Sequence, residues 1–166
     1  MATPPPQANE PVLVYGGGAS SAQYTVQLLA IAGYTRVIVA ASTPHHTTLH
    51  ALGAWKCVDY RAGEAAFVDA VLAATDGAKV KLAIDVIGAR PTLSALGKVV
   101  GGEGAKVAVL IPVKEGNNVT DDVGSAMYFE LPKWVGEVLP GVETVPVYTF
   151  RSQEVRMTIT RSVILL

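Results

Sequence analysis

Cysteine and charge are both scarce in this sequence. Cys57 is the single cysteine among 166 residues, so an internal disulfide and a zinc site made of several thiolates are excluded. Charged residues make up 16% of the chain, whereas about a quarter is usual for a soluble domain. Half of the residues are apolar, and the mean hydropathy is +0.36. We therefore expect a well-packed domain whose surface carries more apolar area than an isolated domain should expose.

The charges that are present balance each other. The 13 Lys and Arg residues against 14 Asp and Glu residues give a net charge of −1, and no basic cluster occurs. The sequence therefore predicts no basic surface that could bind nucleic acid or an anionic membrane. The longest apolar runs, such as residues 107–111, are too short to span a bilayer, and the first residues lack a signal-peptide pattern. We therefore expect a cytoplasmic protein with neither nucleic-acid nor membrane partners.

The length fits one domain, which can bury roughly 70% of its extended-chain surface. Four prolines lie within residues 1–11, which predicts a disordered arm or an inter-domain linker. Residues 12–150 carry regular patterns and form the predicted domain. Residues 151–166 follow no clear pattern, which leaves the structure of this tail open.

Short apolar runs alternate with segments of helical periodicity. Residues 12–15 are continuously apolar and end in three glycines, which is typical of a strand buried on both faces of a parallel sheet. Further strands are predicted at 36–41, 57–60, 80–87 and 105–111, and a candidate sixth strand at 142–150. Helices are predicted at 20–33, 45–52, 64–74 and 91–100. This alternation predicts an α/β fold, a doubly wound parallel sheet between two layers of helices (the three-layer Rossmann fold).

The glycine-rich turn after the first predicted strand is the most informative segment. Its residues are Gly16, Gly17, Gly18, Ala19, Ser20 and Ser21. A turn that links a strand to a helix directs unpaired N–H groups and the positive end of the helix dipole at one place, which suits a pyrophosphate. Gly16 and Gly18 match the first two glycines of G-x-G-x-x-G, while Ser21 stands at the third, and the serine hydroxyls can donate or cap the helix. The alternative is a turn that only allows close packing of helix on strand.

No carboxylate follows the second predicted strand. An NAD site usually places an acid there to bind the ribose 2′-hydroxyl. Here Ser42 and His45 follow the strand, so a 2′-phosphate would meet hydroxyls and imidazoles, and NADP(H) is preferred to NAD(H). The missing acid also argues against a methyltransferase. Ser42 can equally be an ordinary turn or cap residue, and Tyr60, at the end of the third strand, is either a phosphate ligand or structural.

Further candidates lie at the ends of the fourth and fifth predicted strands. Ile87 and Gly88 on one strand, and Leu110 and Ile111 on the other, face the crevice in this fold and are expected to line the nicotinamide side. Asp85 is either a carboxylate that binds nearby backbone or a partner of the cofactor ribose.

Neither a metal site nor a catalytic residue is predicted. His46 and His50 are four residues apart and can share a helix face, but no carboxylate or thiolate stands beside them at ligand spacing. No residue is a convincing acid or base for protonating a reduced substrate.

An ordered succession of short segments carries a family resemblance. The segments are residues 14–17, 28–34, 52–54, 58–61, 83–88 and 111–113. Together they resemble the cofactor domain of the zinc-independent medium-chain dehydrogenases/reductases, above all the fungal enoyl-reductase-like group, and they are similar also to quinone oxidoreductases. The resemblance covers residues 11–150 and implies an NADPH-dependent reductase of activated C=C bonds. It places the phosphates at residues 18–21, Ser42, His45 and Tyr60 around the 2′-phosphate, and residues 87–88 near the nicotinamide ribose.

The resemblance also brings expectations about departures and partners. Members often carry a glycine where Ala22 stands, and an asparagine or a basic residue in the segment of His45 and His46. The GroES-like catalytic domain that normally precedes this region is not in the sequence, so we expect the chain to be inactive on its own. A homodimer that pairs through the strand at the end of the sheet is expected too. The alternative is a non-catalytic Rossmann-like module for nucleotide binding or oligomerisation.

Overall fold

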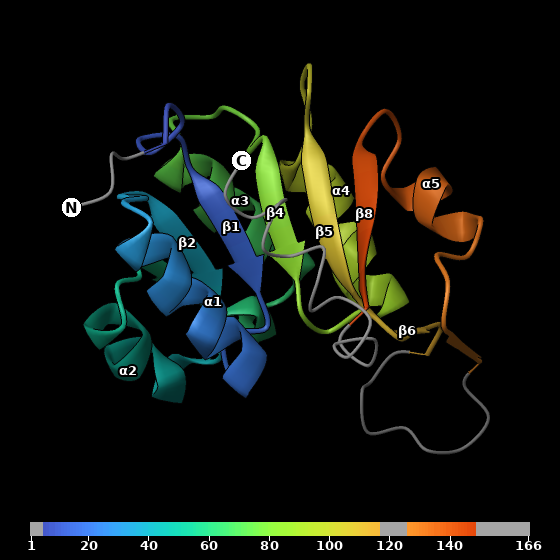
Figure 1. Ribbon diagram of the computed structural model, residues 1–166, viewed down its shortest axis with the longest axis horizontal. Helices are drawn as coiled ribbons and strands as arrows, with labels where there is room; N and C mark the ends of the chain where they lie inside the picture. Colours follow the sequence, from blue (N-terminus) through green and yellow to red (C-terminus); the bar gives the residue numbers. More distant parts are fainter. Residues whose placement is uncertain (1–4, 117–125, 149–166) are drawn as a thin grey trace, which may run out of the picture.

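Six parallel strands form the central sheet, and helices lie on both of its faces (Figure 1). The computed structural model describes residues 5–116 and 126–148. The strand order is β3-β2-β1-β4-β5-β8. The strands are β1 (Val12–Tyr15), β2 (Val37–Ala40), β3 (Lys56–Val58), β4 (Leu82–Asp85), β5 (Lys106–Ile111) and β8 (Glu143–Tyr148). Because the chain moves outward in one direction from β1 and in the other from β4, the winding reverses between these two strands, where ligands bind in folds of this kind.

The helices divide between the two faces according to this reversal. Helices α1 (Ser20–Ile31) and α2 (His46–Ala51) lie in front of the sheet in Figure 1, and α3 (Glu64–Ala74) and α4 (Arg90–Val99) lie behind it. The short helix α5 (Trp134–Val138) packs against α4 beside β8. The predicted three-layer, doubly wound α/β fold is confirmed.

The apolar runs of the sequence form the inner strands for a simple reason. All four residues of β1 and all four of β2 are buried, since helices cover both faces of these strands. One core cluster behind the sheet includes Phe67 and Leu93, and a second cluster in front includes Val26 and Leu49. A strand buried on both sides has no solvent-facing position for a polar residue, which explains its unbroken apolar sequence.

Several element boundaries differ from the sequence-based predictions. The third strand ends at Val58 rather than at residue 60, because Asp59 caps a short 3-10 helix (Tyr60–Ala62). The fourth strand is Leu82–Asp85 rather than 80–87, and Val80 makes only an isolated bridge outside it. The predicted helix at 45–52 is a 3-10 helix (Thr43–His45) followed by α2. The candidate sixth strand is present as β8, which pairs with β5.

Some structure was not predicted at all. The two-residue strands β6 (Val113–Lys114) and β7 (Met127–Tyr128) form an antiparallel pair, and α5 is too short to give a clear helical period. Residues 5–11, where the sequence predicts an arm or linker, form turns in which Ala8 is buried and its carbonyl accepts the Thr35 amide at 2.9 Å. The tail at 151–166 lies outside the described residues. Among the helices that the structure describes, none is long and apolar enough to cross a bilayer.

Candidate functional site

Two cavities are lined by residues at the carboxyl ends of the strands. These strand ends point downward in Figure 1. The first has a volume of about 480 Å³ and is lined by Tyr15, Gly16, Gly18, Ala19, Ser42, His45, Tyr60, Ile87, Ala89, Pro91 and Thr92. The second has a volume of about 390 Å³ and is lined by Ser21, Val86, Ile87, Leu110, Ile111, Pro112 and Lys114. Ile87 lines both cavities, so they adjoin each other at the point where the sheet changes its winding direction.

Most of the candidate residues named from the sequence are brought together here. All of them line one of the two cavities except Gly17, Ser20, Asp85 and Gly88. Gly17 lies behind the turn, where an added Cβ would come within 2.6 Å of the Val39 side chain. Gly88 has φ +61°, and an added Cβ would lie 2.8 Å from the Leu110 carbonyl oxygen. Both glycines therefore allow close packing of the backbone.

The glycine turn holds its shape through backbone contacts. The amides of Gly16 and Gly17 both donate to the carbonyl of Ala40, at 3.0 and 2.9 Å. Gly16 has φ +97°, and a Cβ there would come within 2.6 Å of the Ile87 side chain. A side chain at this position would be strained and would also fill the junction between the two cavities.

The start of α1 presents backbone donors to both cavities. Ala19 is the N-cap in an extended conformation (φ −79°, ψ 145°), and no side chain caps the helix, so neither Ser20 nor Ser21 does so. The first helical bond runs from the Gln23 amide to Ala19. Within the described part of the chain, the amides of residues 18, 20, 21 and 22 have no acceptor. These donors and the positive end of the helix dipole fit a diphosphate.

The far wall of the first cavity comes from the segments that follow β2 and β3. The His45 ring lies against the glycine turn, because a Cβ at Gly18 would come within 3.1 Å of its Nε2 atom. Tyr60 packs on Tyr15, with ring centroids 5.7 Å apart, and Tyr15 packs on Phe67 behind it. Burial raises the pKa of Tyr15 above its ordinary range, so its phenol stays neutral. The cavity therefore has hydroxyl and imidazole groups on one side and amides on the other.

Asp85 supports the site from within the protein. It is fully buried; its Oδ1 accepts the Ile87 amide at 2.9 Å, and its Oδ2 accepts the Thr92 hydroxyl at 2.7 Å. Of the two roles left open by the sequence, the structure supports the carboxyl that binds nearby groups, since Asp85 lines neither cavity. Burial raises its pKa from an ordinary 3.8 to about 6, against the opposing effect of these hydrogen bonds.

Sequence reasoning missed several lining residues. Tyr15 looks like an ordinary core residue of β1, and Thr92 reaches the first cavity only because α4 begins beside it. Lys114 brings a basic side chain to the second cavity, although its position in a polar segment after a proline gives little indication of this. The serine and proline signals that mark a turn do not tell which side chain will face a cavity.

The parallel sheet, its winding reversal and the amides at that point, which have no acceptor among residues 5–116 and 126–148, define the class of Rossmann dinucleotide-binding domains. The family model described as zinc-binding dehydrogenase matches residues 22–128. The chain belongs to this family and forms the cofactor-binding part of the medium-chain dehydrogenase/reductase superfamily, as the sequence resemblance predicted. It is an oxidoreductase cofactor-binding domain, and the family implies a nicotinamide dinucleotide as its cofactor.

Two curated relatives are enoyl reductases by name. The chain is 32% identical over 119 residues to the trans-enoyl reductase tndF of Aspergillus flavipes, covering 70% of this chain and 34% of that protein. It is 27% identical over 110 residues to the dual trans-enoyl reductase/FAD-dependent monooxygenase tazHJ of Aspergillus terreus, covering 65% of this chain and 15% of that protein. The chain thus spans about a third or less of the length of these relatives.

Solved structures agree with this fold. The CurK enoyl reductase superposes with a TM-score of 0.66 at 17% identity, covering 94% of this chain and 40% of that one. A putative NADPH:quinone reductase from Bacillus thuringiensis gives a TM-score of 0.63 at 18% identity, covering 88% and 39%. At these identities the comparison shows the fold alone.

The family's name raises the question of zinc. Across residues 5–116 and 126–148, no three His, Cys, Asp or Glu side chains gather in a way that could hold a metal ion. His46 Nε2 lies 2.9 Å from the Ala41 carbonyl oxygen, and His50 Nδ1 lies 2.9 Å from that of Ala54. These two histidines therefore bind backbone, and the described residues do not fit a zinc site.

Proposed function

We propose that this chain binds NADP(H) and forms the cofactor-binding domain of an enoyl-reductase-like enzyme that reduces activated C=C bonds. The observation that carries the proposal is the start of α1, where several amides have no acceptor among the described residues and where Gly18 and Ala19 line one cavity and Ser21 lines the adjoining one. The preference for NADP(H) is supported by the segment after β2, which places Ser42 and His45, and no carboxylate, on the cavity wall.

The two cavities would bind different parts of the cofactor. Gly18 and Ala19 with the first amides of α1 would hold the diphosphate. The first cavity would take the adenosine half, and the second, with Leu110 and Ile111 as apolar walls, would take the nicotinamide half. When bound, the cofactor supplies the hydride. The residues of this chain orient it and keep water from one side of the nicotinamide.

The proposal also covers the part of the reaction cleft where the substrate would bind. We name no acid or base in this chain, and the second wall of the reaction cleft would come from a catalytic domain outside the described residues. The names of the two curated relatives support a C=C bond conjugated to a carbonyl as the substrate class. Pairing of two copies and a cytoplasmic location remain predictions from the sequence.

Equilibrium titration of the whole chain with NADPH, NADH and S-adenosylmethionine tests the cofactor. We expect NADPH to bind more tightly than NADH, and S-adenosylmethionine not to bind. If neither dinucleotide binds, the proposal is wrong and the non-catalytic module gains support.

The Ser21→Glu variant tests the phosphate site itself. A carboxylate in the first turn of α1 would lie against the diphosphate, so this variant should no longer bind NADPH. Leu28→Glu is the matched control, because it adds the same charge at a position of the same helix that is 65% exposed. Unchanged NADPH affinity in Ser21→Glu would contradict the phosphate site.

A further inference from the structure

Two separate segments build the far wall of the first cavity, and one carboxylate joins them. Ser42 and His45 come from the segment after β2, and Tyr60 comes from the segment after β3. Asp59 belongs to the second segment, directly before Tyr60, and it binds Thr43 of the first segment without lining the cavity itself. The relative position of the two wall segments therefore depends on what Asp59 binds.

Asp59 receives donors from both segments. Its Oδ2 accepts the Thr43 amide at 3.0 Å and also the Thr43 hydroxyl, 16 residues away in the sequence. Its Oδ1 accepts the Arg61 amide at 2.8 Å and thereby caps the 3-10 helix that begins at Tyr60. The guanidinium of Arg61 lies 3.4 Å from both oxygens. Thus Oδ2 accepts hydrogen bonds from the segment after β2, and Oδ1 accepts one from the segment after β3.

The carboxylate is held in its ionised form by these contacts. The Thr43 hydroxyl and the Arg61 amide lower the pKa of Asp59 well below its ordinary value. The side chain is 25% exposed, so it keeps access to water while it stays directed at its donors. Charge-assisted hydrogen bonds of this kind are stronger and more directional than neutral ones.

We propose that Asp59 is a positioning residue for NADP(H) selectivity: by binding Thr43 and Arg61 together, it sets the spacing between Ser42 and His45 on one segment and Tyr60 on the other. The inference rests on the proposed function, because it concerns the 2′-phosphate that this wall would bind. Asp59 itself does not touch the cofactor.

Removing the charge of Asp59 should change the affinity for NADPH in the direction opposite to that expected from charge repulsion alone. A negative charge beside a phosphate site repels the phosphate, so Coulomb's law alone says that removing the charge of Asp59 should strengthen NADPH binding. If positioning dominates, the same change should weaken NADPH binding, because the amide of an asparagine cannot accept at both of its polar atoms. NADH lacks the 2′-phosphate and should be much less affected.

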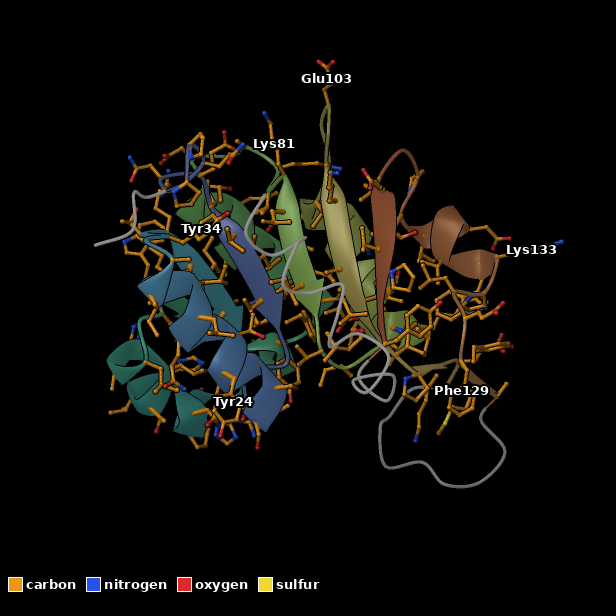
Figure 2. The ribbon with its side chains drawn as sticks, in the orientation of Figure 1. Tyr24, Tyr34, Lys81, Glu103, Phe129 and Lys133 are labelled. Carbon is orange, nitrogen blue, oxygen red and sulfur yellow. The ribbon has the colours of Figure 1, made fainter. Side chains whose placement is uncertain are left out.

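The experiment measures the Kd of NADPH and of NADH for the full chain and its variants. For Asp59→Asn we expect the Kd of NADPH to rise about tenfold and that of NADH by less than about twofold, so the selectivity ratio falls. Thr43→Val should reduce the ratio in the same direction, while Thr43→Ser keeps the hydroxyl and should restore it. Glu103→Gln is the charge control, since Glu103 lies just before β5, at the opposite end of the strands from the cavities (Figure 2).

The outcomes separate this inference from the proposed function. If the wild-type chain binds NADPH selectively and Asp59→Asn leaves the ratio unchanged or increases it, the positioning role is refuted while the cofactor assignment stands. If Thr43→Ser behaves like Thr43→Val, the hydroxyl contact is not what matters, and the proposal is overturned. If the wild-type chain binds neither dinucleotide, both proposals fail together. Thermal unfolding of each variant confirms that the compared proteins are folded.

Discussion

Replacing Asp85 by asparagine should stabilise this protein at neutral and alkaline pH. The Thr92 hydroxyl has one hydrogen but faces two acceptors, Asp85 Oδ2 at 2.7 Å and the Ala89 carbonyl at 2.8 Å. If Asp85 carries a proton on Oδ2, it donates to Thr92, which then donates to Ala89, and all the groups are satisfied. An asparagine makes the same two contacts at every pH, with its Oδ1 accepting the Ile87 amide and its Nδ2 donating to Thr92, and it adds one Nδ2 hydrogen that the protonated carboxyl lacks.

The magnitude follows from the raised pKa of Asp85. A group whose pKa is higher in the folded than in the unfolded protein contributes stability below the unfolded value, and this is lost as the pH rises through the folded value. For Asp85 the window runs from 3.8 to about 6. A difference of about 2 units corresponds to about 3 kcal/mol of unfavourable free energy when the buried carboxyl is ionised.

Urea unfolding of both proteins, followed by circular dichroism between pH 4 and pH 8, measures this effect. The free energy of unfolding of Asp85→Asn should exceed that of the wild type by up to about 3 kcal/mol at pH 8 and by less than about 1 kcal/mol at pH 4. Taking the difference between the two proteins removes the other titrating groups that they share. An equal effect of the substitution at all pH values, or a loss of stability at pH 8, would refute the reasoning.

Two further predictions concern glycines. Gly97→Ala should destabilise the protein by about 2–4 kcal/mol in urea unfolding, because its Cβ would lie 2.0 Å from the Val138 carbonyl oxygen where α4 meets α5. Gly136→Ala, with open space around it in α5, is the control and should be neutral or slightly stabilising; an equal loss in both would count against the close contact. Gly16→Ala should lose both stability and NADPH affinity, whereas Gly102→Ala, with a similar φ of +100° but no neighbour within 4 Å, should lose only the stability due to strain. Equal NADPH titration curves for these two variants would show that the junction between the cavities does not affect NADPH binding.

The sequence predicted where most of the candidate residues lie in the fold because its signals are local. The glycine turn between a buried strand and a helix has a fixed direction in a parallel sheet, so residues 16–21 could be placed at the mouth of the fold. Ser42, His45 and Tyr60 could be expected at one cavity because each follows the end of a strand, and the carboxyl ends of parallel strands lie on the same side of the sheet. The same reasoning placed the end of the third strand two residues too late, since no local pattern shows that Asp59 caps a 3-10 helix.

Contacts between residues that are far apart in the sequence could not be predicted in this way. Helix α5 has five residues, too few for a helical period, and it exists where Gly97 lets α4 come close to it. The sequence left two roles open for Asp85, and only its burial beside Thr92 distinguishes them. The partner of Asp59 is 16 residues away, on a different strand connection.

The sequence alone determined the class of fold and the place of the glycine turn within it, because apolar periodicity and a glycine turn act over a few neighbouring residues. The tertiary structure decided which polar groups meet. Strand pairing brings together the segments after β2 and β3, and it buries Asp85 under α4. Contacts of this kind depend on how far each strand extends and how closely the helices approach, and those quantities come from the packing of the whole domain.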